Sequence, residues 1–382
     1  MLGVAEQSMG PLKMFDKQSG RNGNGQENTE QSSIKRRLVL QGVAALGLGS
    51  ATVGSATAEE RGDWEPGDGK PPWANDDRGE DDDAAVPTAI QLYTLRNLPD
   101  STTDLIRRVG AVDNNGGPGF DAVEFAGLGS ATASEIKTTL EETGVNPASA
   151  HVGLEALEGE SFESTVATYK EIGVNTFIVP YLSPSSIDTV EKVESLAQRM
   201  NKVAANLREY NARLGFHNHD GEFQEIGDGT TPLETFAETL NEEVIFEIDV
   251  GWVLTAGYDP VEVIKQYSGR TELIHMKDME DGEFREIGEG AVDMREVAQV
   301  ARKKADVDYL IYEHDAPSDP AGSVATGAGV LSLLDGEEGP ECIELSDMGG
   351  PNYSGDLGDG KNEDDEDDED EDDEDEDDEE DE

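Results

Sequence analysis

Histidine is the residue type best able to do chemistry in this chain, and only five of the 382 residues are histidine. Each ends or follows a short run of apolar and β-branched residues that predicts a strand. The five are His151, His217, His219, His275 and His314. Acidic side chains stand at equivalent strand ends, namely Glu124, Glu247, Asp249 and Glu313. Imidazoles and carboxylates that converge in this way form a mixed nitrogen and oxygen site for divalent manganese, cobalt, zinc or magnesium.

Eight strand-like runs alternate with eight helical patterns between residues 87 and 335. The strand-like runs cover 89–93, 122–125, 147–151, 176–180, 215–219, 244–249, 273–276 and 309–313. The helical patterns cover 102–112, 133–143, 164–172, 187–214, 232–240, 260–267, 294–303 and 323–334. Eight such units in roughly 250 residues predict a (β/α)8 TIM barrel, an α/β fold whose active site lies at the carboxyl ends of the strands. The alternative, a doubly wound open sheet, normally has a glycine-rich turn after its first strand, and Tyr93-Thr94-Leu95-Arg96 contains no glycine.

Two helix starts are marked by capping residues. Ser185-Ser186 precede the longest helical pattern, and Asp259-Pro260 precede the sixth. Serine and aspartate side chains accept hydrogen bonds from the first amides of a helix, and proline fits its first turn. We therefore predict that helices begin directly after both pairs.

The chain is strongly acidic, with 86 Asp and Glu against 28 Lys and Arg and a formal net charge of −58. Such a chain repels nucleic acid phosphates and anionic membranes, so we expect neither partner. An excess of acidic charge suits a protein kept soluble in concentrated salt, where charges are screened, and indicates a halophilic source. The single cysteine, Cys342, excludes an internal disulfide, and the sequence has no CxxC pair for a structural zinc.

The two ends of the chain predict export and disorder. Arg36-Arg37, a short and mildly apolar stretch, and Ala56-Thr57-Ala58 together describe a twin-arginine signal over residues 1–58. We therefore expect a secreted protein with no membrane insertion once the signal is removed. Residues 59–86 are rich in Gly, Pro and Asp and predict a linker, and the acidic residues 336–382 predict a disordered tail.

Five segments at or near the predicted strand ends resemble the xylose isomerase-like TIM barrel superfamily, in particular the sugar phosphate isomerases and epimerases. The segments are Leu214–Asp220, Glu247–Trp252, Ile274–Asp278, Ile287–Asp293 and Tyr312–Asp315. The resemblance covers residues 87–334, which is essentially the whole predicted barrel. The acidic composition and the export signal are those of a secreted, haloarchaeal-type member.

The resemblance implies one divalent ion held by side chains of strands 5 to 8. Carried over residue by residue, three of the ligands are Asp249, His275 and Glu313. The fourth position normally holds a glutamate on strand 5, and His217 replaces it here. Because epimerases of the family use that glutamate as one of two proton-transfer groups, its absence argues against a symmetric two-carboxylate mechanism. We expect His217 to be the fourth ligand; the alternative is a hydrogen-bonded pocket histidine, with water or Glu247 completing the shell. Trp252 stands where a metal-dependent endonuclease of the superfamily has histidine, which argues against a multinuclear zinc site.

Four further residues are candidates for binding substrate or moving a proton. His219 is the main candidate for the acid or base, with a supporting role behind the ligands as the alternative. Glu124 and His151 would line the substrate cavity, or else cap the loops that follow their strands. Lys277 would neutralise a developing enediolate oxygen or a substrate carboxylate, or else form a surface ion pair with Asp278 or Glu280.

Two of the segments also have a simpler interpretation. Taken alone, Asp249 is equally suited to capping the helix that follows its strand. Gly288-Glu289-Gly290 fits either a phosphate cradle or a plain turn before the next helix. The residue types do not decide between these alternatives.

The expected reaction is metal-dependent isomerisation or epimerisation of a small-molecule sugar, by proton abstraction next to a carbonyl through an enediolate. One alternative is a metal-dependent lyase or hydrolase of oxidised keto-glycosides, and another is a non-catalytic sugar-binding barrel. We expect a substrate without phosphate, because a secreted acidic protein repels phosphorylated sugars. The oligomeric state stays open, with a homo-oligomer as one option.

Overall fold

The computed structural model describes residues 85–114, 118–227, 229–303 and 307–334. The predicted signal region and acidic tail lie outside the described residues, as does the linker except for its last two residues. Export and the boundaries of these end segments therefore stay predictions. No helix within the described part of the chain is both long and apolar enough to cross a membrane.

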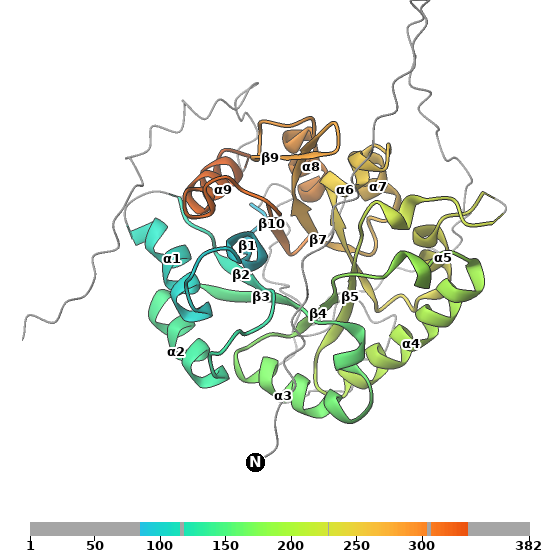
Figure 1. Ribbon diagram of the computed structural model, residues 1–382, viewed down its shortest axis with the longest axis horizontal. Helices are drawn as coiled ribbons and strands as arrows, with labels where there is room; N and C mark the ends of the chain where they lie inside the picture. The colour runs from blue at the N-terminus through green and yellow to red at the C-terminus, as the bar shows by residue number, and fades with distance from the viewer. Residues whose placement is uncertain (1–84, 115–117, 228, 304–306, 335–382) are drawn as a thin grey trace, which may run out of the picture. The chain divides into compact units, whose positions relative to one another are not determined.

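Eight parallel strands close into a barrel, which confirms the predicted TIM fold (Figure 1). They are β1 (Thr88–Gln91), β2 (Ala122–Phe125), β3 (Asn146–His151), β4 (Thr176–Val179), β5 (Arg213–His217), β6 (Ile245–Asp249), β7 (Thr271–Met276) and β10 (Tyr309–Tyr312). Each strand pairs with its neighbours in sequence order, and β1 closes the barrel against β10. All eight predicted strand runs are confirmed, with ends that differ by a few residues.

Helices surround the barrel in the predicted alternation (Figure 1). They are α1 (Thr102–Asn114), α2 (Ala133–Thr143), α3 (Phe162–Glu171), α4 (Val190–Arg208), α5 (Pro232–Thr239), α7 (Pro260–Gln266), α8 (Met294–Lys303) and α9 (Pro320–Leu334). Short 3-10 turns also occur in the described chain, at η1 (Leu92–Leu95), η2 (Leu154–Leu157), η3 (Gly159–Ser161), η4 (Pro184–Ser186) and η5 (Gly221–Phe223).

The start of α4 differs from the prediction, whereas the start of α7 agrees with it. Thr189 caps α4 by accepting a hydrogen bond from the Lys192 amide, and Ser185-Ser186 lie in the separate turn η4. The predicted pattern was also too long at its end, because residues from Arg213 onward already belong to β5. The Asp259 side chain accepts a hydrogen bond from the Val261 amide at the start of α7, as predicted.

Two elements were not predicted, and both lie beside the carboxyl ends of strands. The short helix α6 (Val250–Thr255) follows β6 directly. The strands β8 (Asp278–Glu280) and β9 (Glu283–Arg285) form an antiparallel hairpin after β7. Strands of three residues carry too little hydrophobic alternation to be recognised in a sequence.

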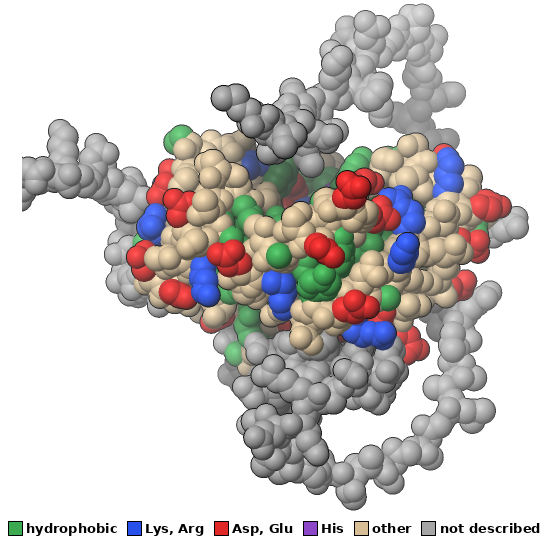
Figure 2. All heavy atoms as spheres, turned by 90° about the horizontal axis from the view of Figure 1, so that it is seen from below, with side chains coloured by type: hydrophobic (Ala, Val, Ile, Leu, Met, Phe, Trp, Pro, Cys, Tyr) green, Lys and Arg blue, Asp and Glu red, His purple; other side chains and the backbone are tan. Residues whose placement is uncertain are grey.

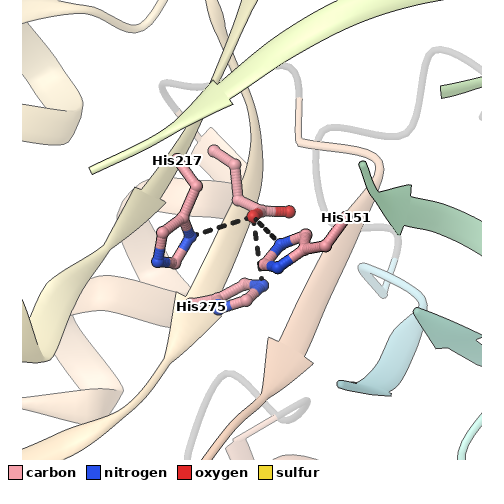
Figure 3. A group of neighbouring side chains, drawn as sticks. His151, His217 and His275 are labelled. Carbon is pink, nitrogen blue, oxygen red and sulfur yellow. Dashed lines mark hydrogen bonds and ion pairs between the residues drawn. The ribbon is translucent and has the colours of Figure 1, made fainter. Parts of the chain in front are cut away.

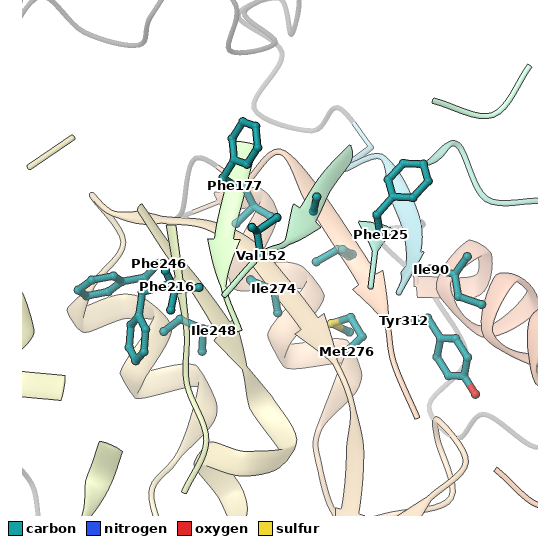
Figure 4. Packing of buried hydrophobic residues seen from close by; sticks show 14 of the residues in the cluster. Ile90, Phe125, Val152, Phe177, Phe216, Phe246, Ile248, Ile274, Met276 and Tyr312 are labelled. Atoms are coloured by element: carbon teal, nitrogen blue, oxygen red, sulfur yellow. The ribbon is translucent and has the colours of Figure 1, made fainter. Parts of the chain in front are cut away.

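Apolar side chains pack in two separate clusters, one between the barrel and the helices and one inside the barrel. The outer cluster includes the large rings of Phe177, Phe216 and Phe246 (Figure 4). The inner cluster is small and consists of Ala89, Ala122, Ile178, Ile245, Leu273 and Ile311. It fills the barrel below a layer of buried polar side chains at the carboxyl ends of the strands.

Glycine at position 215 of β5 is required by this inner packing. A Cβ at Gly215 would lie 2.4 Å from Cδ1 of Ile178 and 2.9 Å from Cγ1 of Ile245. Side chains two residues apart on a strand face the same side. His217 therefore points into the barrel one layer above this close contact, as Glu124, Glu247, His275 and Glu313 do on the other strands.

The acidic chain does not present a uniformly negative surface. On the face seen in Figure 2, acidic and basic side chains are interspersed around a small hydrophobic patch. Ion pairs at the surface of the described chain include Arg199 with Glu158 (2.6 Å) and Lys192 with Asp188 (2.6 Å). Exposed pairs of this kind contribute little to stability individually, so the stability of the fold depends mainly on other contacts.

A largely buried ion cluster links the amino-terminal ends of four strands. Arg213 donates from Nε to Oγ1 of Thr176 (2.9 Å) and from Nη2 to Oδ2 of Asp308 (2.5 Å), and it also pairs with Glu272. These residues come from β4, β5, β7 and the approach to β10, so one guanidinium links four strands of the barrel.

Replacing Arg213 by methionine should lower the free energy of unfolding by about 3–5 kcal/mol, because buried carboxylates would lose the cation that neutralises them. Chemical denaturation followed by circular dichroism measures this change. Arg208→Met, which removes the longer contact to Glu243 (3.6 Å), is the matched control and should change stability by less than about 1 kcal/mol. Equal losses in the two variants would contradict a special role for Arg213.

Candidate metal centre and active site

A layer of polar side chains fills the barrel directly above its apolar plug. The carboxylate of Glu247 lies at the centre of this layer, and the imidazoles of three strands surround it (Figure 3). Its Oε2 atom is 2.8 Å from Nε2 of His151, 2.9 Å from Nδ1 of His217 and 3.3 Å from Nε2 of His275. Glu247 and His275 are fully buried, and His217 is nearly so.

Glu124 forms a second buried carboxylate in the same layer. It accepts hydrogen bonds from Nε2 of Gln91 (2.7 Å) and Oγ of Ser149 (2.6 Å), and it lies 2.7 Å from Nε2 of His275. Burial opposes the ionisation of Glu124, but the charges of His151 and His275 hold its pKa well below the usual range. Glu124 is therefore ionised, and its contacts fix the side chains of Gln91, Ser149 and His275.

The charge state of each imidazole follows from its surroundings. Burial lowers the pKa of His217 well below its usual value, and the nearby cations lower it further, so this imidazole is neutral. Burial also opposes the charge on His151, but Glu124 and Glu247 raise its pKa to about 10. His275 likewise has a pKa raised well above its usual value by Glu247, Glu313 and Glu124, in spite of burial.

The inner carboxylates determine which imidazole nitrogens face outward. Because Glu247 accepts the Nδ1 proton of neutral His217, the lone pair of His217 lies on Nε2, which is 3.9 Å from Oδ2 of Asp249. Glu124 holds Nε2 of His275, so that Nδ1 faces Glu313 (2.8 Å) and Asp249 (3.9 Å). Carboxylates behind histidines orient metal ligands in this way in many proteins.

Four side chains thus offer one donor atom each to a common point. In His217, Asp249, His275 and Glu313 these atoms all lie within 4.8 Å of one another, and all four residues are buried. Two nitrogens and two carboxylate oxygens are a donor set that suits a divalent transition metal. Binding would displace the Nδ1 proton of His275, since a ligand nitrogen must be deprotonated. The residues present therefore fit the expected ion.

A second set of converging donors consists of His151, His217, Glu247 and His275. His217 and His275 belong to both sets. Toward Glu247 they present Nδ1 of His217 and Nε2 of His275, whereas the first set uses the other nitrogen of each ring. Both sets could be filled together only if each shared imidazole bridged two ions. The two sets are therefore alternatives, and the single ion expected from the sequence stays a prediction.

Lys277 lies beside the first set of donors and carries a positive charge. Its Nζ is 2.9 Å from Oδ2 of Asp249, 2.9 Å from Oε2 of Glu313 and 2.6 Å from Oδ2 of Asp315. Burial opposes the charge, but these three carboxylates raise the pKa of Lys277 well above its usual value. Only 2% of the residue is exposed, so the alternative of a surface ion pair with Asp278 is wrong.

Asp249 combines the two functions that the sequence left open. Its Oδ1 accepts a hydrogen bond from the Trp252 amide (2.9 Å) and caps α6, while Oδ2 faces Lys277 and the imidazoles. Burial raises the pKa of Asp249 to about 6, partly offset by the charge of Lys277. Helix capping and ligation are therefore compatible, because each uses a different oxygen.

His219 lies next to His217 at the mouth of the barrel, with ring centroids 5.0 Å apart. Its Nδ1 atom is buried and has no hydrogen-bond partner among the described residues. Burial lowers the pKa of His219 to about 4, and repulsion from Lys277 contributes. His219 is therefore neutral near pH 7, with a ring nitrogen free for a ligand or a proton. His314 is also buried, and its Nδ1 accepts a hydrogen bond from the Ala316 amide.

Several residues of the site were missed by sequence reasoning. Gln91 and Ser149 hold Glu124, Asp315 completes the shell of Lys277, and Glu222 accepts a hydrogen bond from the His219 amide (2.8 Å). Burial raises the pKa of Glu222 to about 7. Gln91 was recognisable, because it ends the first strand at the level where the other strands carry ionisable residues.

The loop 288–290 is a turn organised by the protein itself. Oδ2 of Asp278 accepts hydrogen bonds from the amides of Gly288 (2.9 Å) and Gly290 (2.9 Å), and Oδ1 accepts one from the Val292 amide (3.1 Å). The amides that would cradle a phosphate already bind a carboxylate. The plain-turn interpretation is thus the one that the geometry supports.

Comparison with known proteins agrees with the barrel fold. A family model described as xylose isomerase-like TIM barrel matches residues 118–333, more than half of the chain. The chain belongs to this family. The matched region includes seven of the eight barrel strands and all the donors of the candidate metal centre.

Curated relatives of this xylose isomerase-like protein include inosose dehydratases. That of Clostridium perfringens is 24% identical over 151 residues, which cover 34% of this chain and 49% of the relative. That of Geobacillus kaustophilus is 23% identical over 183 residues, which cover 42% of this chain and 58% of the relative. The chain thus spans about half the length of the curated relatives that it matches.

Solved structures with the same fold include a sugar phosphate isomerase/epimerase from Parabacteroides distasonis, with a TM-score of 0.57 and 20% identity over 70% of this chain and 99% of that chain. Another is a probable 3-DHS dehydratase from Bacillus anthracis, with a TM-score of 0.50 and 14% identity over 64% of this chain and 98% of that chain. At these identities the likeness shows the fold alone.

Proposed function

We propose that this protein is a divalent-metal-dependent sugar isomerase or epimerase. The observation that carries the proposal is the convergence of His217, Asp249, His275 and Glu313 beside the free Nδ1 atom of His219. A bound divalent ion would stabilise negative charge that develops on substrate oxygens. This leaves the chain itself to bind the sugar, exclude water and move a proton.

The proton-transfer group that fits best is His219. It is neutral near pH 7 because of its lowered pKa, so Nδ1 can accept a proton from the carbon next to a sugar carbonyl. Lys277 favours the ionised form of the carboxylates of Asp249 and Glu313, which are two of the converging donors. Return of the proton to the neighbouring carbon isomerises the sugar, and delivery of a proton to the opposite face of the same carbon by a second group epimerises it.

A second candidate is a lyase or hydrolase of oxidised keto-glycosides. In this reaction the anion formed by the same proton abstraction expels a leaving group instead of taking up a proton. The dehydratase names of the curated relatives favour this fate, since dehydration eliminates water. The presence of His217 where epimerases of the family carry a glutamate also favours it. A non-catalytic sugar-binding barrel is disfavoured, because binding alone does not require four converging donors.

Incubation of manganese-loaded protein with a panel of ketoses, aldoses and 3-keto-glycosides in heavy water, followed by NMR, should distinguish these reactions. We expect loss of an α-proton signal in the true substrate before a new sugar accumulates. Elimination would give an unsaturated product instead. The Asp249→Ala protein is the control and should show no exchange. If no compound exchanged or converted, the binding-protein hypothesis would replace the enzyme.

A further inference from the structure

Four rings form a continuous arc beside the candidate metal centre, which we call the aromatic wall. Its members are Tyr181, His219, Trp252 and Phe284. The ring centroids of successive members are 5.5 Å, 5.4 Å and 5.6 Å apart. They come from the loops after β4 and β5, from α6 and from β9, all at the carboxyl ends of strands.

The aromatic wall adjoins the candidate metal centre directly. The ring of His219 is 5.0 Å from that of His217, and Nζ of Lys277 lies 5.3 Å from the ring centroid of Trp252. His219 and Trp252 are the two middle members of the wall, and one end of the wall reaches solvent, because Tyr181 is 56% exposed. A molecule that lies along the wall would therefore extend from the centre to the rim of the barrel.

The hairpin that carries Phe284 is held in place at two points. At its start, Asp278 accepts hydrogen bonds from the three loop amides described above. Just after β9, Glu286 accepts hydrogen bonds from the hydroxyls of Tyr312 and Ser323. A Cβ at Gly290 would lie 2.2 Å from Oδ1 of Asp278, so this packing requires glycine. Phe284 is thus part of a preformed surface.

Two polar atoms of the wall have no hydrogen-bond partner among the described residues. They are Nε1 of Trp252 and Nδ1 of His219, and both are buried. A buried donor without a partner is unfavourable by about 1–3 kcal/mol, so such atoms indicate a ligand that supplies one. Aromatic faces beside a donor and an acceptor match a sugar ring, whose C–H groups pack on π faces while its hydroxyls form hydrogen bonds.

The cations around the wall are already engaged. Lys277 is surrounded by three carboxylates, and Arg285 pairs with Glu280 (3.3 Å) and Glu283 (3.0 Å). Arg96 stacks on Tyr93 and donates hydrogen bonds to backbone carbonyls. The glycine amides of the loop after β9 bind Asp278. This environment favours a neutral ligand over a phosphorylated one.

We propose that the aromatic wall binds the ring of an unphosphorylated cyclic sugar, with Trp252 Nε1 donating to one of its hydroxyls. The inference rests on the proposed function for the reaction, but it concerns binding and can be tested without turnover. It assigns substrate selectivity to Trp252 and Phe284, which lie in the two elements that the sequence did not predict.

Protein labelled with 5-fluorotryptophan and loaded with magnesium provides the test. Methyl α-D-glucopyranoside, methyl β-D-galactopyranoside and myo-inositol serve as ring probes, with glucose 6-phosphate and open-chain sorbitol for comparison. The ¹⁹F signal of Trp252, assigned by its loss in Trp252→Phe, should shift with at least one ring probe and not with sorbitol or the phosphate. Tighter binding of the phosphate, or no response to any ring probe, would overturn the proposal.

Calorimetry with the same probes measures the effect of each residue. Trp252→Phe keeps an aromatic face but removes the N–H donor, and it should weaken ring binding about five- to tenfold. Phe284→Leu should weaken it to a similar extent. Tyr93→Phe, at an exposed ring outside the wall, is the matched control and should bind normally. Unchanged affinity in both wall variants would contradict the proposal.

The two proposals fail separately. A Trp252 response to a ring sugar without proton exchange in any compound would support the aromatic wall while removing the isomerase. Proton exchange by a substrate that leaves the Trp252 signal unchanged would support the reaction and overturn the wall.

Discussion

Replacing Asp249 by asparagine should weaken manganese binding more than 100-fold and abolish turnover. Asparagine keeps an Oδ1 acceptor for the Trp252 amide, so the cap of α6 is preserved while the charged ligand oxygen is lost. Loss of residues that merely orient a ligand already weakens metal binding about 10- to 100-fold, and loss of the ligand itself should exceed that. Glu313→Gln should behave in the same way.

Isothermal titration with manganese at neutral pH measures this prediction. Asp259→Asn is the matched control, because Asp259 caps α7 through an equivalent hydrogen bond and is not among the converging donors. Its metal affinity should be unchanged. Normal manganese affinity in both Asp249→Asn and Glu313→Gln would remove the proposed centre. Glu247→Gln should give the smaller loss expected of an orienting residue.

The same site should bind metal less tightly in acid. Burial raises the pKa of Asp249 to about 6, so this carboxyl is protonated below that pH and ionised above it. Since a proton and a metal ion compete for the ionised form, protonation of Asp249 should lower affinity by about a further tenfold per pH unit below 6, in addition to the loss caused by the His275 proton, which is displaced on both sides of pH 6. Above pH 6 this contribution to the pH dependence should disappear.

The strand ends were the predictable part of this site, because they follow from local sequence. An apolar run of four to six residues identifies a strand, and parallel strands in a barrel bring their carboxyl ends together. The sequence therefore predicts, without knowledge of any contact, that four side chains lie close together: His217, Asp249, His275 and Glu313. Their convergence in the structure comes from this topology.

What the sequence could not give were contacts between distant residues. The outward direction of His275 Nδ1 depends on Glu124, which lies 151 positions away. The burial of Lys277 depends on carboxylates of β6 and of the segment after β10. The aromatic wall depends on a hairpin of two three-residue strands that is held by Asp278 and Glu286. No local pattern encodes which side chains these elements will meet.

Replacing His219 by glutamine should lower turnover about 10²- to 10⁴-fold while leaving metal affinity within a few-fold of normal, as expected for loss of a proton-transfer group. His219 has the free Nδ1 atom beside the centre but is not one of the converging donors. His314→Gln is the control, since Nδ1 of His314 already accepts a hydrogen bond from the Ala316 amide and His314 is not one of the converging donors. Undiminished turnover in His219→Gln would move the base to Glu124, Glu247 or His151.

The pH profile of the normal protein at saturating metal distinguishes the possible bases further. A base must be deprotonated, so activity is lost as pH falls through its pKa. An unperturbed imidazole would give this loss near pH 6.5. Burial and the charge of Lys277 lower the pKa of His219 to about 4, so we expect activity to persist at pH 5 and to fall near pH 4. A loss near pH 7 that disappears in Glu222→Gln would instead identify Glu222, whose pKa burial raises to about 7, as the group that controls the reaction.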